Sequence, residues 1–220
     1  MKSLIIANWK ANPSTLGGAR DLFDLVAKGI KNEKKTEIVI CPPFLYLLGL
    51  KSKISNLKLG AQDCFWADGA FTGEISSEML KNSGIKYVIV GHSERRGNLG
   101  ETEEMIGKKI KAVLRSGLKP ILCISNLTQI KNSPKGVKEK IIIAFEPVSA
   151  IGVGKPYNVE RAKKMREAID YPFVLYGGSV GSRNAQDYIK KAGFQGLLVG
   201  TASLIPSEFI KIVKRIGNLD

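Results

Sequence analysis

The sequence predicts an α/β protein that folds as a single (β/α)8 barrel over residues 1–220, shortened in the unit after the fifth strand. Three observations predict this fold class. The chain carries eight short apolar runs, helical patterns alternate with them, and 44% of its 220 residues are apolar, which is enough for one continuous core. An open, doubly wound sheet would produce a similar series of elements, so periodicity alone leaves that alternative open.

The runs predicted to form strands are short, rich in β-branched residues and mostly apolar throughout. Parallel strands have this composition because both of their faces are buried. The predicted strands comprise residues 4–7, 38–41, 57–61, 87–90, 120–124, 140–145, 172–176 and 196–199.

The segments between these runs carry the pattern of helices with one apolar stripe. In residues 16–30 the stripe contains Leu22, Leu25, Val26 and Ile30. Residues that favour helix N-termini open several of the later segments. These further helices are predicted at residues 101–116, 158–169, 183–192 and 206–216.

The unit after the fifth run is predicted to be incomplete. Residues 125–139 include Pro134 and Gly136, both unfavourable in a helix interior, and leave space for at most one or two helical turns. Barrels of this kind typically have about 250 residues. A chain of 220 residues therefore lacks part of the usual structure, and we expect the loss in this unit.

Composition argues against a membrane protein and a metal protein. The longest nearly unbroken apolar stretch, residues 43–50, is far shorter than the roughly 20 residues that cross a bilayer, and residues 1–7 do not resemble a signal peptide. Cys41, Cys64 and Cys123 form no CxxC pair, and with a single histidine they do not match zinc spacings. We expect a cytoplasmic protein with reduced, mostly buried thiols, no metal and no membrane contact.

The net charge of +14 raises the alternative of an RNA-binding module, since basic surfaces attract phosphate polymers. The lysines are spread over nearly every segment, however, and fall where helix surfaces or turns are predicted. Such a module would also need interleaved exposed aromatic residues, and aromatic residues total only 7% here. We expect solvated lysines and no nucleic-acid partner, while the positive field attracts small phosphorylated dianions.

Polar residues that directly follow strands are the candidates for a site, because the loops after parallel barrel strands converge on one face. Glu146 follows the apolar run of residues 141–145, whose surroundings raise the affinity of its carboxylate for a proton and suit a general base. His92 follows another buried strand and can donate a hydrogen bond to a substrate oxygen. We expect the two side chains to face each other across a pocket that binds a dianion at its rim.

Structural roles for these residues are the alternatives. Glu146 could form an ion pair with a lysine, and a lone histidine such as His92 is often a hydrogen-bonded core residue. Lys10 could extend its charge into solvent and Asn8 could cap a turn.

Two glycine-rich turns, residues 176–180 and 200–203, follow the seventh and eighth runs. Glycine permits close approach of the backbone, and the first amides of a following helix offer unpaired donors to an anion. Each turn by itself is also typical of a simple tight turn. Their place after the last two strands, where barrels commonly bind phosphate, favours a phosphate site.

Taken together, four ordered segments resemble the triosephosphate isomerase family, which adopts the TIM barrel and needs no cofactor. These are Asn8-Trp9-Lys10, Gly91-His92-Ser93-Glu94-Arg95-Arg96, Ala144-Phe145-Glu146-Pro147-Val148 with Ala150-Ile151-Gly152, and Tyr176-Gly177-Gly178-Ser179-Val180. The resemblance implies the interconversion of dihydroxyacetone phosphate and D-glyceraldehyde 3-phosphate, in glycolysis and gluconeogenesis.

The resemblance also implies a role for each matching residue. In this family a glutamate base works with a neutral histidine, so Glu146 would move the proton while His92 and Asn8 polarise the carbonyl and hold the enediolate. Lys10 would supply positive charge, and Glu94 matches the acid beside that lysine. The implied substrate and phosphate contacts are Asn8, Lys10, Gly152, Ser179, Gly200 and Thr201.

The segment after Glu146 matches the family's closing lid, with Tyr176 and Ser179 as its latch. The lid residues are Pro147, Val148, Ser149, Ala150, Ile151, Gly152, Val153, Gly154 and Lys155. The chain departs from the family at Phe145, Ser149 and Asn126, where tyrosine, tryptophan and glutamate are usual. These three changes concern one cluster, so we expect a lid that hinges differently.

The loop after the third run resembles the loop that the family inserts into a partner subunit. Its matching residues are Phe71, Thr72, Gly73 and Glu74. A homodimer is implied, with Thr72 near the neighbouring active site, and the shortened fifth unit permits a tetramer.

The alternative function is that of another phosphate-binding barrel. Such a barrel could be a sugar-phosphate epimerase, or a non-catalytic scaffold that keeps only the anion site. Neither alternative needs Glu146 or explains the ordered loops.

Overall fold

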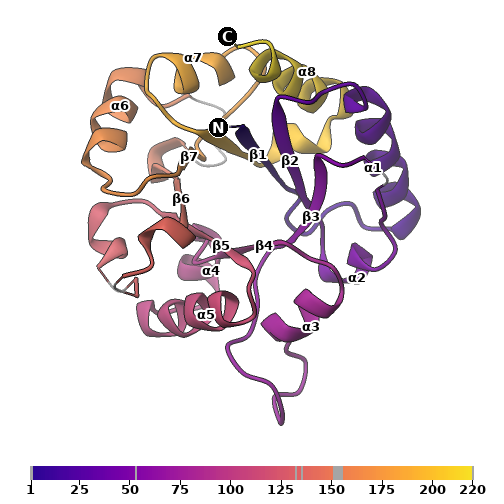
Figure 1. The fold of residues 1–220 in the computed structure, drawn as a ribbon, viewed down its shortest axis with the longest axis vertical. Helices are drawn as coiled ribbons and strands as arrows, with labels where there is room; N and C mark the ends of the chain where they lie inside the picture. Colours follow the sequence, from indigo (N-terminus) through magenta and orange to yellow (C-terminus); the bar gives the residue numbers. More distant parts are fainter. Residues whose placement is uncertain (1, 53, 132, 135, 151–155, 220) are drawn as a thin grey trace.

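The computed structural model describes residues 2–52, 54–131, 133–134, 136–150 and 156–219. Eight parallel strands pair in chain order and close into a barrel, because β8 pairs with β1 (Figure 1). The predicted (β/α)8 barrel is confirmed, and the open sheet is excluded. The strands are β1 (Ser3–Asn8), β2 (Thr36–Cys41), β3 (Leu57–Ala61), β4 (Tyr87–Val90), β5 (Lys119–Ile124), β6 (Ile142–Phe145), β7 (Val174–Tyr176) and β8 (Gly196–Val199).

Helices surround the ring of strands (Figure 1). The α-helices are α1 (Leu16–Ile30), α2 (Phe44–Leu47), α3 (Ser77–Asn82), α4 (Ser93–Asn98), α5 (Glu103–Arg115), α6 (Val159–Ala168), α7 (Ala185–Lys190) and α8 (Pro206–Gly217). The 3₁₀ segments within the described residues are η1 (Leu127–Ile130), η2 (Lys138–Lys140), η3 (Val148–Ala150) and η4 (Thr201–Leu204).

Strand side chains alternate between two cores. In β1, Leu4 and Ile6 belong to the cluster that fills the barrel, while Ile5 and Ala7 belong to the larger cluster between strands and helices. All four are buried. Both faces of the strand are therefore apolar, and this explains why the predicted strands are continuous apolar runs.

Helix α1 shows how local sequence sets an element. Thr15 caps its first turn by accepting a hydrogen bond from Gly18 N at 3.1 Å. Its buried stripe recurs every three or four residues and includes Val26 and Ile30. The prediction that Leu25 belongs to this stripe is wrong, because the residue lies about 100° around the helix from Val26 and its side chain is 54% exposed.

The unit after β5 is reduced, as predicted. Between β5 and β6, the described residues form only the 3₁₀ turns η1 and η2, with no α-helix. Gly136 adopts a φ of +75°, a left-handed conformation that does not continue a helix.

Helices α2, α3 and α4 were not predicted. Each has four to six residues, too few to show a helical period. Helix α4 buries none of its residues, so it has no apolar stripe to detect.

The long loop between β3 and α3 extends from the barrel (Figure 1). Phe65 stacks on Trp66 with ring centroids 4.0 Å apart and contacts Phe71 at 4.6 Å. Near the loop's end, Phe71 is 43% exposed, and Gly73 turns the chain with a φ of +89°. A packed aromatic base thus supports an exposed tip.

Three further properties of the described residues concern membranes, metals and cysteines. No helix among them is long and apolar enough to cross a bilayer, and they contain no group of three or more metal-binding side chains. Cys41, Cys64 and Cys123 are buried and unpaired, as predicted. Burial raises the pKa of the Cys64 thiol to about 12, which keeps the thiol protonated and unreactive.

Candidate active site

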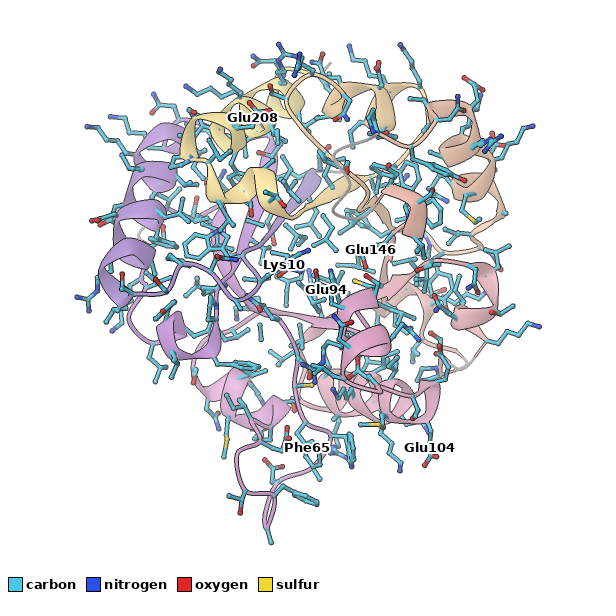
Figure 2. All side chains as sticks on the ribbon, turned by 180° about the vertical axis from the view of Figure 1, so that it is seen from behind. Lys10, Phe65, Glu94, Glu104, Glu146 and Glu208 are labelled. Carbon is cyan, nitrogen blue, oxygen red and sulfur yellow. The ribbon has the colours of Figure 1, made fainter. Side chains whose placement is uncertain are left out.

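A cavity of about 600 Å³ opens at the carboxyl ends of the strands. Figure 2 shows Lys10 and Glu146 close together at the centre of the barrel mouth, with Glu94 beside them. The structure therefore brings together residues predicted from five separate loops. Those that line the cavity are Asn8, Lys10, His92, Glu146, Ser179, Gly200 and Thr201.

Lys10 is held by its backbone as well as by its side chain. Its φ of +53° is uncommon for a residue with a side chain, a conformation that costs on the order of 1–3 kcal/mol. The amide of Lys10 donates to Asn8 Oδ1 at 3.1 Å, and its carbonyl accepts a hydrogen bond from Gln62 Nε2 at 2.8 Å. These bonds fix the backbone from which the lysine side chain extends.

The ammonium group of Lys10 lies close to an acid and to the turn that follows β8. Its Nζ is 2.5 Å from Glu94 Oε1. A Cβ placed on Gly200 would lie 4.0 Å from Nζ. Glu94 does not line the main cavity, but it lines a smaller adjoining one of about 230 Å³ together with Asn8 and His92. The predicted neighbourhood of Lys10 and Glu94 is thus present.

His92 joins β4 to α4 and serves as the N-cap of that helix. Its Nδ1 lies 3.2 Å from the backbone N–H of Glu94 and accepts it when the ring is neutral, so that Nε2 then carries the ring proton. The other ring nitrogen, Nε2, lies 3.2 Å from Glu146 Oε1. The local turn therefore directs the N–H of a neutral ring toward the carboxylate.

Glu146 is 3% exposed, and its backbone N–H donates to Ile124 O at 2.7 Å. One carboxylate oxygen contacts His92, while the buried Oε2 has no hydrogen-bond partner among the described residues. Glu146 and His92 touch directly, so the cavity lies beside the pair and not between them as predicted.

Competing effects act on the His92 ring. Burial lowers its pKa, but the charge of the Glu146 carboxylate, the hydrogen bond to it and the charge of Glu94 act in the opposite direction. The positive charge of Lys10 lowers the pKa only slightly. The net direction is upward, so the influences of Glu146 and Glu94 together outweigh burial, which is the largest single one.

Replacement of His92 by glutamine should therefore reduce stability more in acid than in alkali. A pKa raised above the unfolded value of about 6.5 stabilises the fold fully below that pH, and the stabilisation is lost as the pH rises through the folded pKa. Melting temperatures of the parent and His92→Gln at about pH 6 and about pH 9 measure this effect. A difference between the two proteins that is the same at both pH values would contradict the assignment.

The turn after β7 contacts the described part of the predicted lid. Both the amide and the hydroxyl of Ser179 donate to Ala150 O, at 3.0 and 2.6 Å. Val148 is 68% exposed, and the ring of Phe145 packs edge-on against Tyr157 at 6.1 Å. The two flanks of the lid are therefore in contact. The predicted lid residues Ile151, Gly152, Val153, Gly154 and Lys155 lie outside the described residues.

Tyr176, the second predicted latch residue, is fully buried. Its ring stacks on Tyr188 with centroids 3.6 Å apart, and its hydroxyl has no hydrogen-bond partner in the described part of the chain. Ser179 thus contacts the lid here, while Tyr176 packs under α7. Asn126 caps η1 by accepting the N–H of Thr128 at 3.0 Å and so has a local structural role.

The sequence did not identify several residues of the site. Gln62 supports Lys10. Gly177 belongs to the predicted turn of residues 176–180 but had no role of its own there, and it lies against Glu146. Asn184 and Glu208 also line the cavity. The two glycines and the asparagine that follow β7 were a detectable signal for this turn. Glu208 had no such signal, because it belongs to a helix and lies 26 residues beyond its partner Ser182 in the sequence.

Gly177→Ala should lower kcat about 100-fold. A Cβ at this position would lie 2.8 Å from Glu146 Cγ, closer than side-chain carbons pack, so the carboxylate must move. A displacement of about 1 Å in a catalytic group is sufficient for such a loss. Steady-state kinetics measure the effect, and Gly17→Ala, where a Cβ meets nothing within 4 Å, is the matched control. Equal loss in both variants, or none in Gly177→Ala, would contradict the expected clash.

A buried carboxylate in contact with an imidazole, a lysine beside them and two glycine-rich turns at the carboxyl ends define the class of phosphate-binding (β/α)8-barrel enzymes. Comparison with known proteins narrows this class. The family model described as Triosephosphate isomerase matches residues 3–216, and the chain belongs to that family. The chain is therefore an isomerase of the aldose–ketose type.

Curated relatives of the chain have the same name, and the similarity covers nearly the full length of each of them. A triosephosphate isomerase from Aquifex aeolicus (strain VF5) is 43% identical, covering 97% of this chain and 99% of that protein. One from Thermoanaerobacter sp. (strain X514) is 39% identical, with 96% and 98% covered. The Aquifex alignment extends over 245 residues, 25 more than the 220 of this chain, in agreement with a shortened barrel.

Proposed function

We propose that this chain interconverts dihydroxyacetone phosphate and D-glyceraldehyde 3-phosphate by proton transfer through an enediolate. The observation that carries the proposal is the contact of Glu146 with His92 at 3.2 Å, beside a cavity that the two glycine-rich turns also line. A base, a hydrogen-bond donor and an anion site are the three parts that this reaction needs.

In the proposed reaction, Glu146 takes a proton from the carbon next to the carbonyl. The electron pair of that C–H bond forms the C–C double bond, and the carbonyl electrons move to oxygen. His92 Nε2–H and the Asn8 amide stabilise this oxygen, while Lys10 balances the developing charge. Glu146 then returns the proton to the former carbonyl carbon, which binds it with the electron pair of the C–C double bond. The hydroxyl proton of the first carbon moves to the former carbonyl oxygen, so that the carbonyl and hydroxyl groups have exchanged carbons, and no cofactor takes part.

The substrate has to separate Glu146 from His92, because their contact leaves no space for a carbon chain between them. Separation removes the largest influence that raises the pKa of His92. Burial and the charge of Lys10, which lower the pKa, then remain, together with the weaker influence of Glu94. The ring becomes the neutral donor that polarisation of a carbonyl requires.

The phosphate is proposed to bind the backbone amides of Gly152, Ser179, Gly200 and Thr201. The Ser179 amide and hydroxyl both donate to Ala150 O. A phosphate oxygen would replace this carbonyl, so binding would release residues 147–155 to close with Tyr176 and Ser179 as latch. Because the lid begins directly after Glu146, its closure also moves the base.

The same proposal covers assembly and location. The exposed tip with Phe71, Thr72, Gly73 and Glu74 supports a homodimer in which the loop enters the partner, and the open surface after β5 permits a tetramer. We propose one barrel domain over residues 1–220, which acts in glycolysis and gluconeogenesis in the cytoplasm.

Coupled assays with each triose phosphate test the proposal. We expect turnover in both directions, with kcat/KM in the range of about 10⁴–10⁸ M⁻¹ s⁻¹, and no loss after treatment with EDTA. A pentose 5-phosphate is the comparison substrate for the epimerase alternative. Folded protein that leaves both triose phosphates unchanged would overturn the proposal, and epimerisation of the pentose phosphate would support the alternative.

A further inference from the structure

Three side chains outside the catalytic group converge on the turn of residues 179–182, which follows β7. Asn184 precedes α7, whereas Glu208 and Arg215 belong to α8. Figure 2 shows Glu208 on α8, away from Lys10 and Glu94. We call Asn184, Glu208 and Arg215 the turn clamp.

The turn clamp forms four hydrogen bonds with the backbone of the turn. Asn184 Nδ2 donates to Ser179 O at 3.0 Å, and Asn184 Oδ1 accepts Gly181 N–H at 2.8 Å. Glu208 Oε1 accepts Ser182 N–H at 2.6 Å, and Arg215 Nη1 donates to Ser182 O at 2.6 Å. Each bond therefore reaches a different peptide group.

These four peptide groups are consecutive. A peptide group is planar, so one hydrogen bond to its C=O or N–H orients the whole group. Asn184 orients the groups on either side of Val180, and Glu208 and Arg215 orient the next two. None of the four bonds uses the side chain or the amide of Ser179, which both donate to Ala150 O beside the cavity.

We propose that Asn184 and Glu208 are positioning residues that hold the turn of residues 179–182 in the shape that binds the substrate's phosphate. The proposal rests on the proposed function, since it assumes that Ser179 contacts the phosphate. Donors held in place before binding give tighter binding than donors that become ordered on binding. The clamp thus acts on the phosphate through the backbone and not on the reacting carbons.

Glu208 is otherwise a poor neighbour for a dianion, because its carboxylate lines the same cavity. The hydrogen bond from Ser182 N–H is the main influence that lowers its pKa, so the carboxylate is ionised. Its charge is directed at the backbone N–H and lies near Arg183 and Lys211. The presence of Glu208 at the rim of the proposed anion site is explained by its hydrogen bond, because the backbone N–H of Ser182 needs an acceptor.

The test compares a phosphorylated with an unphosphorylated substrate. For Asn184→Ala and Glu208→Ala, we expect kcat/KM with D-glyceraldehyde 3-phosphate to fall about tenfold or more, because the turn is no longer held. With D-glyceraldehyde, which has no phosphate, kcat/KM should stay within about twofold of the parent. The inhibition constant of inorganic phosphate should rise by a factor similar to the fall in kcat/KM with D-glyceraldehyde 3-phosphate. Glu208→Gln retains an acceptor for Ser182 N–H and should restore most of the loss.

Matched controls lie at the opposite end of the barrel. Asn56 Nδ2 donates to Glu33 O at 2.7 Å and to Thr36 O at 3.1 Å, and Glu33 Oε1 accepts Lys35 N–H at 2.6 Å. Asn56→Ala and Glu33→Ala remove similar side-chain bonds to a loop. They should lower the melting temperature without changing the ratio of kcat/KM for the two substrates.

Equal losses with both substrates would overturn the proposal, since they would show a purely structural role, and so would an unchanged phosphate inhibition constant. If the parent does not isomerise triose phosphates, the proposed function fails. In that case, direct titration of the parent and of Asn184→Ala with inorganic phosphate still tests whether the turn clamp supports phosphate binding. Equal phosphate affinity in the two proteins, or no phosphate binding by the parent, would overturn the clamp proposal.

Discussion

Glu146→Gln is expected to lower kcat for D-glyceraldehyde 3-phosphate about 1,000-fold or more. Glutamine has nearly the same shape but cannot accept a proton, so the variant loses general-base catalysis, which contributes up to about 10⁴-fold. Glu146→Asp retains the carboxylate but withdraws it by one methylene group. Because a displacement of about 1 Å is sufficient for a 100-fold loss, this variant should also lose most of its kcat.

The same coupled assay measures both variants, with melting temperatures to verify that they fold. Glu37→Gln is the matched control, because its carboxylate accepts the hydroxyl of Tyr87 at the other end of the barrel. It should leave kcat unchanged. Parent-like rates in both Glu146 variants would reject Glu146 as the base, and with it the proposed mechanism.

Lys10→Met is expected to reduce kcat/KM about 100- to 1,000-fold, the effect of removing one electrostatic contact to the transition state. Methionine has a similar length and tolerates the backbone no worse than lysine does, so the variant removes chiefly the charge. It also leaves Glu94 without the partner that lies at 2.5 Å, next to an anion site. Repulsion between Glu94 and the phosphate should then add to the loss.

Dependence on ionic strength distinguishes this effect from misfolding. The kcat/KM of the parent should decrease with added salt, because salt screens the attraction between Lys10 and a dianion, and the variant should respond less. Lys119→Met is the control, since Lys119 lies over the Tyr87 ring at the amino ends of the strands. A Lys10→Met variant with unchanged kcat/KM would show that the lysine does not contact the substrate.

The sequence by itself determined the order of strands and helices and the residues from which the site is built. Continuous apolar runs separated by helical patterns were sufficient to predict all eight strands, because strands buried on both faces show a strong local signal. Glu146 and His92 were identifiable because each directly follows such a run. The reduced unit after β5 was predictable as well, since proline and glycine disrupt helices locally.

Tertiary structure decided which of these residues touch. Closure of β8 on β1 sets the distances across the barrel mouth, so the contact between Glu146 and His92, 54 residues apart, has no local signal. The same holds for Glu208 with Ser182 and for Ser179 with Ala150. Local patterns report whether a side chain is buried, whereas its partner depends on how distant elements pack together.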